Sequence, residues 1–215
     1  MTTLDSLLAV AIHDAKNQLA ALNTWLEVAH REHPSPALDH ALGIADEVAA
    51  GLVALLALYR EGEGHLRLSI DDRNLRDFCD DLFAALRLPA GHVVRIERGA
   101  AEVAAERIGP WAFDAYLVRM VLLDALRNAV RHARTTVRFA LTREAGGICF
   151  TVADDGEGFP APLLDGGDGV MGQGGSGLGL RFARLIAMRH ATPDGRHGRV
   201  ELANAAGAVF RLILP

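Results

Sequence analysis

The sequence predicts an α+β fold in which an N-terminal helical hairpin precedes a two-layer α/β sandwich. Apolar residues recur at spacings of three and four over residues 4–31, and they dominate residues 37–59. That periodicity is typical of amphipathic helices. After residue 64, short β-like runs alternate with helical patterns, and several neighbouring runs read as hairpins. This mixture favours a sandwich over a parallel, doubly wound sheet.

Residues 1–62 are predicted to form two antiparallel helices. The motif HPSP at 33–36 interrupts the helical pattern, because proline disfavours helix at its own position and at the preceding one. A lone hairpin cannot cover two apolar stripes, so we expect a second copy of the chain to complete a homodimeric four-helix bundle. The stripe of the first helix consists of Leu4, Leu8, Ala11, Ala15, Leu19, Leu22, Leu26 and Ala29.

A second domain is predicted at residues 65–215. Residues 61–64, Glu-Gly-Glu-Gly, are predicted to be a linker, since two glycines flanked by charge end a helix and supply nothing to pack. Strands are expected at 66–70, 93–97, 136–142, 148–153, 199–202 and 208–214. Helices are expected at 72–88, 111–133 and 177–189.

Composition and charge exclude several classes of function. A net charge of −5 without a basic cluster argues against binding to nucleic acid. Cys79 and Cys149 form no spaced motif, so neither a disulfide framework nor a zinc site is expected. The longest uninterrupted apolar run, residues 52–59, is shorter than the roughly 18 residues of a membrane span. We therefore expect a cytoplasmic protein with no membrane span.

The first helix carries a candidate nucleophile at His13. The ring is two residues from Ala11 and from Ala15, about 200° around the helix, so it is expected to project away from the apolar stripe into solvent. Asp14 lies beside it and could fix the imidazole tautomer through a hydrogen bond, while Asn17 follows one turn later on the same face. Alone, this run is typical of a solvated helix face; it becomes specific only through its companions.

A candidate magnesium site lies on the helix with the sequence VLLDALRNAVRHA. Asp124 and Asn128 are one turn apart, and Arg131 and His132 occupy the next turn. Mg²⁺ prefers hard oxygen donors such as carboxylate and amide oxygens and keeps several waters. This helix is therefore predicted to hold magnesium through Asp124 and Asn128, with Arg131 and His132 close to the ligand.

Two glycine-rich motifs complete a candidate phosphate-binding site. In DDGEGF, the carboxylate of Asp154 at the end of a strand could accept a hydrogen bond from an adenine amino group, and Gly156 and Gly158 let the backbone turn tightly. GGSGLGL at 174–180 leads into a helix, whose N-terminal N–H groups can receive phosphates. Its candidate residues are Gly175, Gly177, Leu178 and Gly179.

Other nucleotide-binding motifs are absent. The glycine-rich stretch lacks the GK[ST] of a P-loop and the strand-turn-helix context of a Rossmann motif. The chain also lacks the catalytic loop of Ser/Thr/Tyr protein kinases. Taken in order, its motifs instead resemble the catalytic core of two-component sensor histidine kinases, whose ATP-binding fold is shared with DNA gyrase, a heat-shock chaperone and mismatch-repair ATPases.

The resemblance covers nearly the whole chain and implies roles for particular residues. His13 matches the phosphorylated histidine, Asp14 the acidic base, and Asn17 a position needed for phosphatase action on the partner. Asn128 matches the Mg²⁺ ligand and Asp154 the adenine-reading aspartate. Gly156, Gly158, Gly175, Gly177 and Gly179 match the flexible glycines around ATP. The implied cofactors are ATP and Mg²⁺, and the implied partner is the receiver domain of a response regulator, which accepts the phosphoryl group on an aspartate.

The chain departs from the family pattern at three places. Asp124 stands where many members carry asparagine; an acid there implies slow ATP hydrolysis. Gln18 replaces a common proline, which implies a straighter first helix. Residues 160–173, the expected lid over ATP, are short and lack an aromatic anchor, so we expect them to be mobile without nucleotide. Only twelve residues precede His13, so we expect input from a separate sensor protein or a missing segment.

Two alternative functions compete with a kinase. One is a histidine phosphotransfer protein with a degenerate kinase domain that does not use ATP; intact Asp154 and GGSGLGL argue against it. The other is a regulatory binding module like the anti-sigma serine kinases, which have no use for an N-terminal histidine hairpin.

Overall fold

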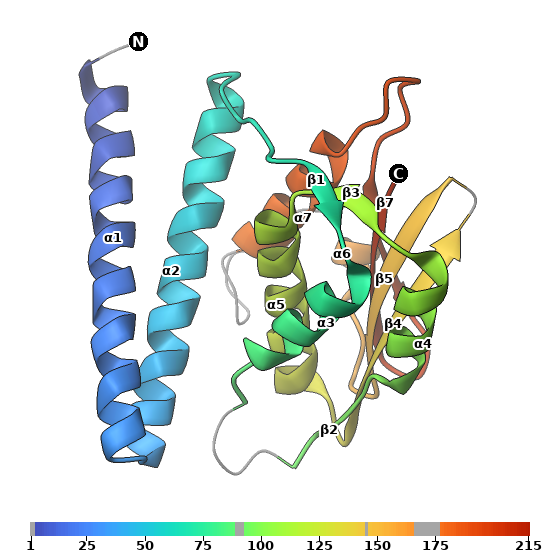
Figure 1. Ribbon diagram of the computed structural model, residues 1–215, viewed down its shortest axis with the longest axis horizontal. Coiled ribbons are helices and arrows are strands. Elements are labelled where there is room, and N and C mark those ends of the chain that lie inside the picture. Colours follow the sequence, from blue (N-terminus) through green and yellow to red (C-terminus); the bar gives the residue numbers. More distant parts are fainter. Residues whose placement is uncertain (1–2, 89–92, 145, 166–176) are drawn as a thin grey trace. The chain divides into compact units, whose positions relative to one another are not determined.

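The computed structural model describes residues 3–88, 93–144, 146–165 and 177–215, with the backbone alone at residues 3–10, 13 and 100. The chain forms two compact units, one of residues 1–67 with 87–92 and one of residues 68–86 with 93–215. The predicted α+β class, with a helical hairpin ahead of a sheet-based domain, is confirmed (Figure 1).

Two long helices, α1 (Thr3–Glu32) and α2 (Pro36–Gly62), form the hairpin of the first unit (Figure 1). Ser35 begins α2, since its Oγ accepts a hydrogen bond from Leu38 N at 3.3 Å. Pro36 follows in the first helical turn, where its missing N–H would have had no partner. The break therefore falls at HPSP, as predicted.

Two polar pairs join the helices at different positions along the hairpin. Asn23 Nδ2 on α1 donates to Asp46 Oδ1 on α2 at 3.1 Å. Near the turn, His30 Nε2 lies 2.7 Å from Asp39 Oδ1. These pairs fix the register in which the apolar faces of the two helices meet.

The end of α2 corrects the predicted linker at 61–64. Glu61 and Gly62 belong to the last turn of the helix. Gly64 has φ +71° and donates to Glu61 O at 2.9 Å, while His65 N donates to Arg60 O at 2.8 Å. These paired bonds are those of a Schellman motif, which satisfies the last carbonyls of a helix. The non-helical connection therefore begins at Glu63.

Among the described residues, α2 is the one helix that is long and apolar enough to cross a membrane. Its most apolar 18-residue window has a mean hydropathy of 1.9 and is 28% buried. This is weak evidence, because a core helix of a soluble protein meets the same criterion. The absence of a membrane span stays a prediction. The buried side chains of α2 are Leu42, Ala45, Ala54, Leu56 and Ala57.

A five-stranded sheet of order β2-β4-β5-β7-β6 organises the second unit. β2 runs parallel to β4, and the other neighbours are antiparallel. The strands are β2 (Arg95–Glu97), β4 (Thr136–Glu144), β5 (Gly147–Asp154), β6 (Arg199–Asn204) and β7 (Ala208–Leu214). A separate two-stranded ladder joins β1 (Asp71–Arg73) to β3 (Trp111–Phe113).

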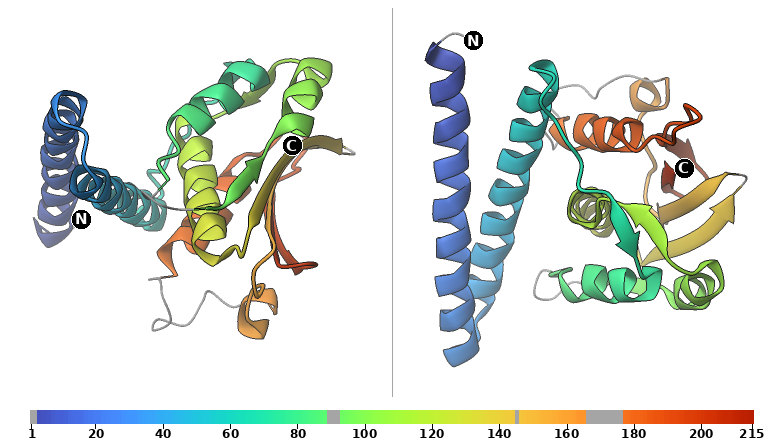
Figure 2. Two further views of the ribbon diagram at one scale, coloured as in Figure 1. Left: turned by 90° about the horizontal axis from the view of Figure 1, so that it is seen from below. Right: turned by 45° about the horizontal axis from the view of Figure 1, so that its top comes forward.

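Helices α5 and α7 cover one face of this sheet (Figure 2). Burial alternates along β4: Val137, Phe139 and Leu141 are buried, and the residues between them are more exposed. Phe78, Phe113, Phe139 and Phe150 extend this core, with neighbouring ring centroids 4.9 to 6.3 Å apart. The helices are α3 (Leu75–Ala84), α4 (Gly99–Ile108), α5 (Ala115–His132), α6 (Ala161–Leu164) and α7 (Leu178–Arg189).

The strand predicted at residues 66–70 is wrong. The chain forms β1 immediately afterwards, at Asp71–Arg73, because that segment pairs with β3. An exposed Asp-Asp-Arg tripeptide gives no strand signal in a sequence. The strand predicted at 93–97 is also too long, since β2 begins at Arg95, where the pairing with Thr136 starts.

Two predicted helices start too early. Residues 111–113 of the helix predicted at 111–133 form β3, and α5 begins after Asp114, whose Oδ1 accepts from Leu117 N at 2.9 Å. The helix predicted at 72–88 is only α3, because Asn74 caps its start by accepting from Arg76 N at 2.9 Å.

Helix α4 was not predicted at all. Its buried side consists of the small residues Ala101 and Ala105, which give a weak apolar period. The chain between β2 and β3 is therefore a short helix that the spacing of large apolar residues does not indicate.

Buried Asp114 joins three segments of the second unit. Its Oδ2 accepts from Ser69 N at 2.8 Å, and its own N–H donates to Nε2 of the buried His190 at 3.0 Å. His190 Nδ1 lies 2.7 Å from Ile186 O, so the ring proton belongs on Nδ1. Burial lowers the pKa of His190, which favours this neutral form. The start of α5, the end of α7 and the segment that enters the unit are thus held together.

Candidate nucleotide-binding site

The carboxylate of Asp154 lies buried at the end of β5. Its Oδ1 accepts hydrogen bonds from Gly156 N at 2.8 Å and from Ala208 N at 3.1 Å. Within the part of the chain that the structure describes, no hydrogen bond reaches Oδ2. One oxygen is therefore fixed by the fold, and the other is an acceptor left for a ligand.

Gly156 and Gly207 are glycines because backbone atoms occupy the space of a Cβ. A Cβ at Gly156 would lie 2.2 Å from His132 O at the end of α5. A Cβ at Gly207 would lie 2.5 Å from Asp154 O. Gly156 was predicted from its motif, whereas Gly207 was missed, because its requirement comes from a residue far away in the sequence.

Asp155, which sequence reasoning also missed, ties the same turn to the segment after α5. Its carboxylate accepts from Arg134 N, Thr135 N and Thr136 N at 2.8 to 3.1 Å, and from the Thr135 hydroxyl. The Thr135 hydroxyl and then these backbone donors hold the pKa of Asp155 well below its usual range. The doubled aspartate after a strand was the available signal.

Asp124 and Asn128 lie one turn apart on α5. Asn128 Nδ2 donates to Asp124 Oδ2 at 3.3 Å, which leaves the side-chain oxygen of the exposed Asn128 for another partner. Asp124 also lies against the start of α7, because a Cβ at Gly179 would be 2.2 Å from its Oδ2. The carboxylate therefore joins α5 to α7 in addition to its predicted role as a magnesium ligand.

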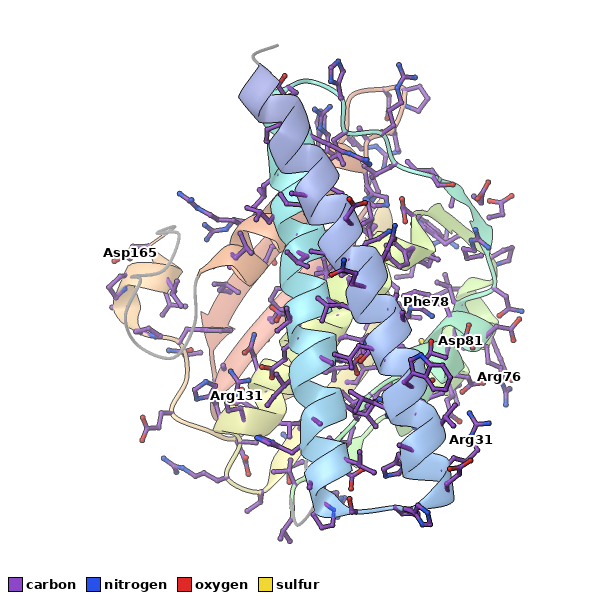
Figure 3. The ribbon with its side chains drawn as sticks, turned by 90° about the vertical axis from the view of Figure 1, so that its left-hand side faces the viewer. Arg31, Arg76, Phe78, Asp81, Arg131 and Asp165 are labelled. Atoms are coloured by element: carbon purple, nitrogen blue, oxygen red, sulfur yellow. The ribbon has the colours of Figure 1, made fainter. Side chains whose placement is uncertain are left out.

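The two residues that end α5 are exposed. Arg131 lies in the last turn (Figure 3), where a basic side chain also complements the helix dipole. His132 follows it and contributes its carbonyl oxygen to the contact with Gly156. Contact of either side chain with a nucleotide stays a prediction.

The start of α7 falls at the end of the motif predicted to receive phosphates. Gly177 precedes the helix with φ +66°, a left-handed conformation that favours glycine. Leu178 and Gly179 form the first turn of α7, and backbone N–H groups at the N-terminus of a helix can receive phosphates. Gly175 and residues 166–173 of the predicted lid lie outside the described residues.

The candidate phosphoacceptor residues lie on α1 in the other unit. Asp14 and Asn17 are exposed. The side chain of His13 lies outside the described part of the chain, so its projection into solvent stays a prediction.

These residues fit an adenine nucleotide with magnesium. Asp154 Oδ2 offers an acceptor to an amino group, and the start of α7 offers donors to phosphates. In the described ranges, no three His, Cys, Asp or Glu side chains are grouped to hold a metal by themselves. A Mg²⁺ that arrives with phosphates needs only one or two protein oxygens, and Asn128 and Asp124 are the residues predicted to offer them.

Comparison with known proteins identifies the domain that carries this site. Residues 113–215 match the family described as histidine kinase-, DNA gyrase B- and HSP90-like ATPase. The chain is also 29% identical over 169 residues to the signal transduction histidine-protein kinase AfsQ2 of Streptomyces coelicolor. That match covers 75% of this chain and 29% of the relative, so the chain spans less than a third of the relative's length.

Solved structures share the fold. Full-length ShkA in complex with AMPPNP matches 98% of this chain and 45% of its own, with a TM-score of 0.65 and 19% identity. The Acinetobacter baumannii histidine kinase AdeS matches 92% of this chain and 95% of its own, with a TM-score of 0.58 and 17% identity. These two structures show a shared fold, while the family match at residues 113–215 and the similarity to AfsQ2 indicate an ATPase-type domain and homology to a sensor histidine kinase.

Replacing Gly179 by alanine tests the contact between Asp124 and α7. Alanine is ordinarily about 1 kcal/mol more favourable than glycine in a helix. Here we expect Gly179→Ala to destabilise the protein by about 1 to 2 kcal/mol, because its Cβ meets the carboxylate. In an Asp124→Ala background, the same change should stabilise. Urea unfolding of the four proteins measures this coupling, and equal effects in both backgrounds would contradict the contact.

Proposed function

We propose that this protein is an ATP-dependent histidine kinase that phosphorylates its own His13 and passes the phosphoryl group to an aspartate of a response-regulator receiver domain. The observation that carries the proposal is the half-satisfied carboxylate of Asp154 inside an ATPase domain of the histidine kinase type. A histidine phosphotransfer protein that does not use ATP would have no need of this arrangement.

In this proposal, different residues of the second unit bind the adenine, the phosphates and Mg²⁺. Asp154 Oδ2 accepts from the adenine amino group, and Asn128 and Asp124 offer oxygens to Mg²⁺. The first turn of α7, with Gly177, Leu178 and Gly179, donates backbone N–H groups to phosphate. Bound ATP supplies the γ-phosphoryl group. The protein contributes positioning and neutralisation of charge, which dominate catalysis of phosphoryl transfer.

His13 is the proposed phosphoryl acceptor, and Asp14 is the proposed base beside it. A lone pair on one ring nitrogen forms a bond to the γ-phosphorus, the bond from that phosphorus to the bridging oxygen breaks, and ADP leaves with the bonding electrons. The ring becomes positively charged, so the carboxylate of Asp14 stabilises it and takes the proton from the other nitrogen. Asn17 is proposed to act in the reverse direction, as a phosphatase residue toward the regulator.

Asp154→Asn tests the ATP site without changing its shape. The asparagine oxygen can keep the two backbone bonds, but its NH₂ group then faces the adenine amino group, donor against donor. We expect affinity for Mg-ATP to fall by roughly 100-fold or more, as measured by calorimetry. Asp194→Asn, an exposed carboxylate paired with Arg196, is the matched control and should bind like wild type. Unchanged affinity in Asp154→Asn would remove the adenine contact.

A homodimer is proposed through the hairpin. Ile44, Val48 and Leu55 are exposed, and their spacing of four and seven residues places them on one face of α2. On α1, Leu22 and Trp25 are exposed, and Trp25 is 72% exposed. Exposed apolar side chains that gather on a helix face mark an interaction surface, and a second hairpin would cover them in a four-helix bundle.

Charged substitutions on this face test the dimer. Val48→Glu with Leu55→Glu should convert a dimer into a monomer, because burying two carboxylates in an apolar interface is strongly unfavourable. Arg60→Glu, at an exposed position of the same helix that lies about 120° to 160° around its axis from these residues, is the control and should stay dimeric. Sedimentation equilibrium at micromolar concentration measures the mass; a wild-type value near the single-chain mass of 23.0 kDa would contradict pairing.

Signal input and location complete the proposal. The stimulus is proposed to reach the hairpin, which carries His13, through a separate sensor protein or through a segment outside residues 1–215. A cytoplasmic location is proposed as well, since receiver domains and ATP are found there.

A further inference from the structure

The turn of residues 154–159 is held at Phe159 by Asn204, a residue outside the predicted nucleotide-binding motifs. Asn204 is the last residue of β6. Its Oδ1 accepts from Phe159 N at 2.7 Å, and its Nδ2 donates to Phe159 O at 2.9 Å. The amide side chain therefore pairs with the N–H and the C=O of Phe159 as a neighbouring strand would.

The backbone conformation of Gly158 and its lack of a Cβ leave room for this side chain. Its φ of +87° is left-handed, and a Cβ there would lie 2.7 Å from Asn204 Cγ and 2.8 Å from its Oδ1. The contact with Asn204 therefore requires glycine at the second glycine position of DDGEGF, whether or not a ligand also approaches it.

The β6–β7 hairpin contacts both ends of the turn. At one end, Ala208 N donates to Asp154 Oδ1, the carboxylate proposed to read adenine. At the other end, Asn204 holds Phe159. Asn204 and Ala208 are direct partners in the antiparallel ladder, so the two contacts are rigidly coupled. Loss of the Asn204 contact would free the Phe159 end of the turn while leaving the hairpin in place.

We propose that Asn204 is a positioning residue for nucleotide binding: its clamp on Phe159 keeps the turn, and with it the Asp154 carboxylate, in the binding geometry before a nucleotide arrives. This inference rests on the proposed ATP site. A turn that is already ordered loses less conformational entropy on binding, so preorganisation appears as affinity. Asn204 itself contacts the turn and not the reacting groups, so the rate at saturating ATP should not depend on it.

Asn204→Ala tests this role. We expect Mg-ATP and ADP to bind about tenfold more weakly, both to the same extent, because two hydrogen bonds that order the turn are lost. The rate of autophosphorylation at saturating ATP should stay within about twofold of wild type. Hydrogen exchange at the Phe159 N–H, followed without nucleotide, should accelerate. Calorimetry well below the unfolding temperature measures the two affinities.

Two further variants separate positioning from loss of stability. Asn204→Asp keeps the size and the acceptor but places an oxygen opposite Phe159 O, so it should weaken binding as Asn204→Ala does. Asn74→Ala removes the N-cap of α3, where Asn74 accepts from Arg76 N and Asp77 N. That control should lower the unfolding temperature and leave ATP affinity unchanged.

The possible results distinguish this inference from the proposed function. Wild-type protein that binds no ATP would overturn the ATP site, and the role of Asn204 with it. Wild-type binding combined with unchanged affinity in Asn204→Ala and Asn204→Asp would overturn the positioning role alone. Equal weakening in Asn74→Ala would also overturn it, because the effect would then follow stability and not the turn.

Discussion

The rest of the candidate site depends on the two hydrogen bonds that fix Oδ1 of the Asp154 carboxylate. Two backbone N–H groups, from Gly156 and Ala208, bind Oδ1. A buried carboxylate is tolerated only when hydrogen bonds replace the water it loses. Because both donors are backbone groups, the turn after β5 and the β6–β7 hairpin must come together before the other oxygen can meet a ligand.

This requirement explains the glycines around the carboxylate. At Gly156 and Gly207 the positions of a Cβ are already taken by backbone of other segments, and at Gly158 by the Asn204 side chain. A side chain at any of these positions would push apart the elements that supply the donors. Asp155 works in the same direction, since its bonds to residues 134–136 hold the turn against the end of α5. Rigidity at this turn contrasts with the flexibility that glycine-rich sequence ordinarily indicates.

Helices α5 and α7 are joined at two levels. Near the middle of α5, the Asp124 carboxylate packs against Gly179; at the start of α5, Asp114 N–H donates to His190, just beyond the end of α7. Asp114 also accepts from Ser69 N, on the segment that leads from the hairpin into the second unit.

The features that short stretches of sequence determine were predicted correctly. The helical hairpin follows from apolar spacing and a proline break, and the ATPase domain from motifs that each lie within thirteen residues. Prediction failed where partners are distant: Asn204 is 45 residues from Phe159, and the reason for Gly207 lies at Asp154. It also failed at α4, whose buried face is alanine, and at β1, whose strand character comes only from pairing with β3.

Phosphorylation of His13 is tested most directly by incubating the protein with Mg²⁺ and γ-labelled ATP and then treating the labelled protein with acid. Label on His13 should be lost in acid and stable in base, as phosphohistidine is. It should be absent from His13→Gln and present in His33→Gln, an exposed histidine in the turn between α1 and α2. Acid-stable label, or full labelling of His13→Gln, would contradict a histidine kinase that uses this residue.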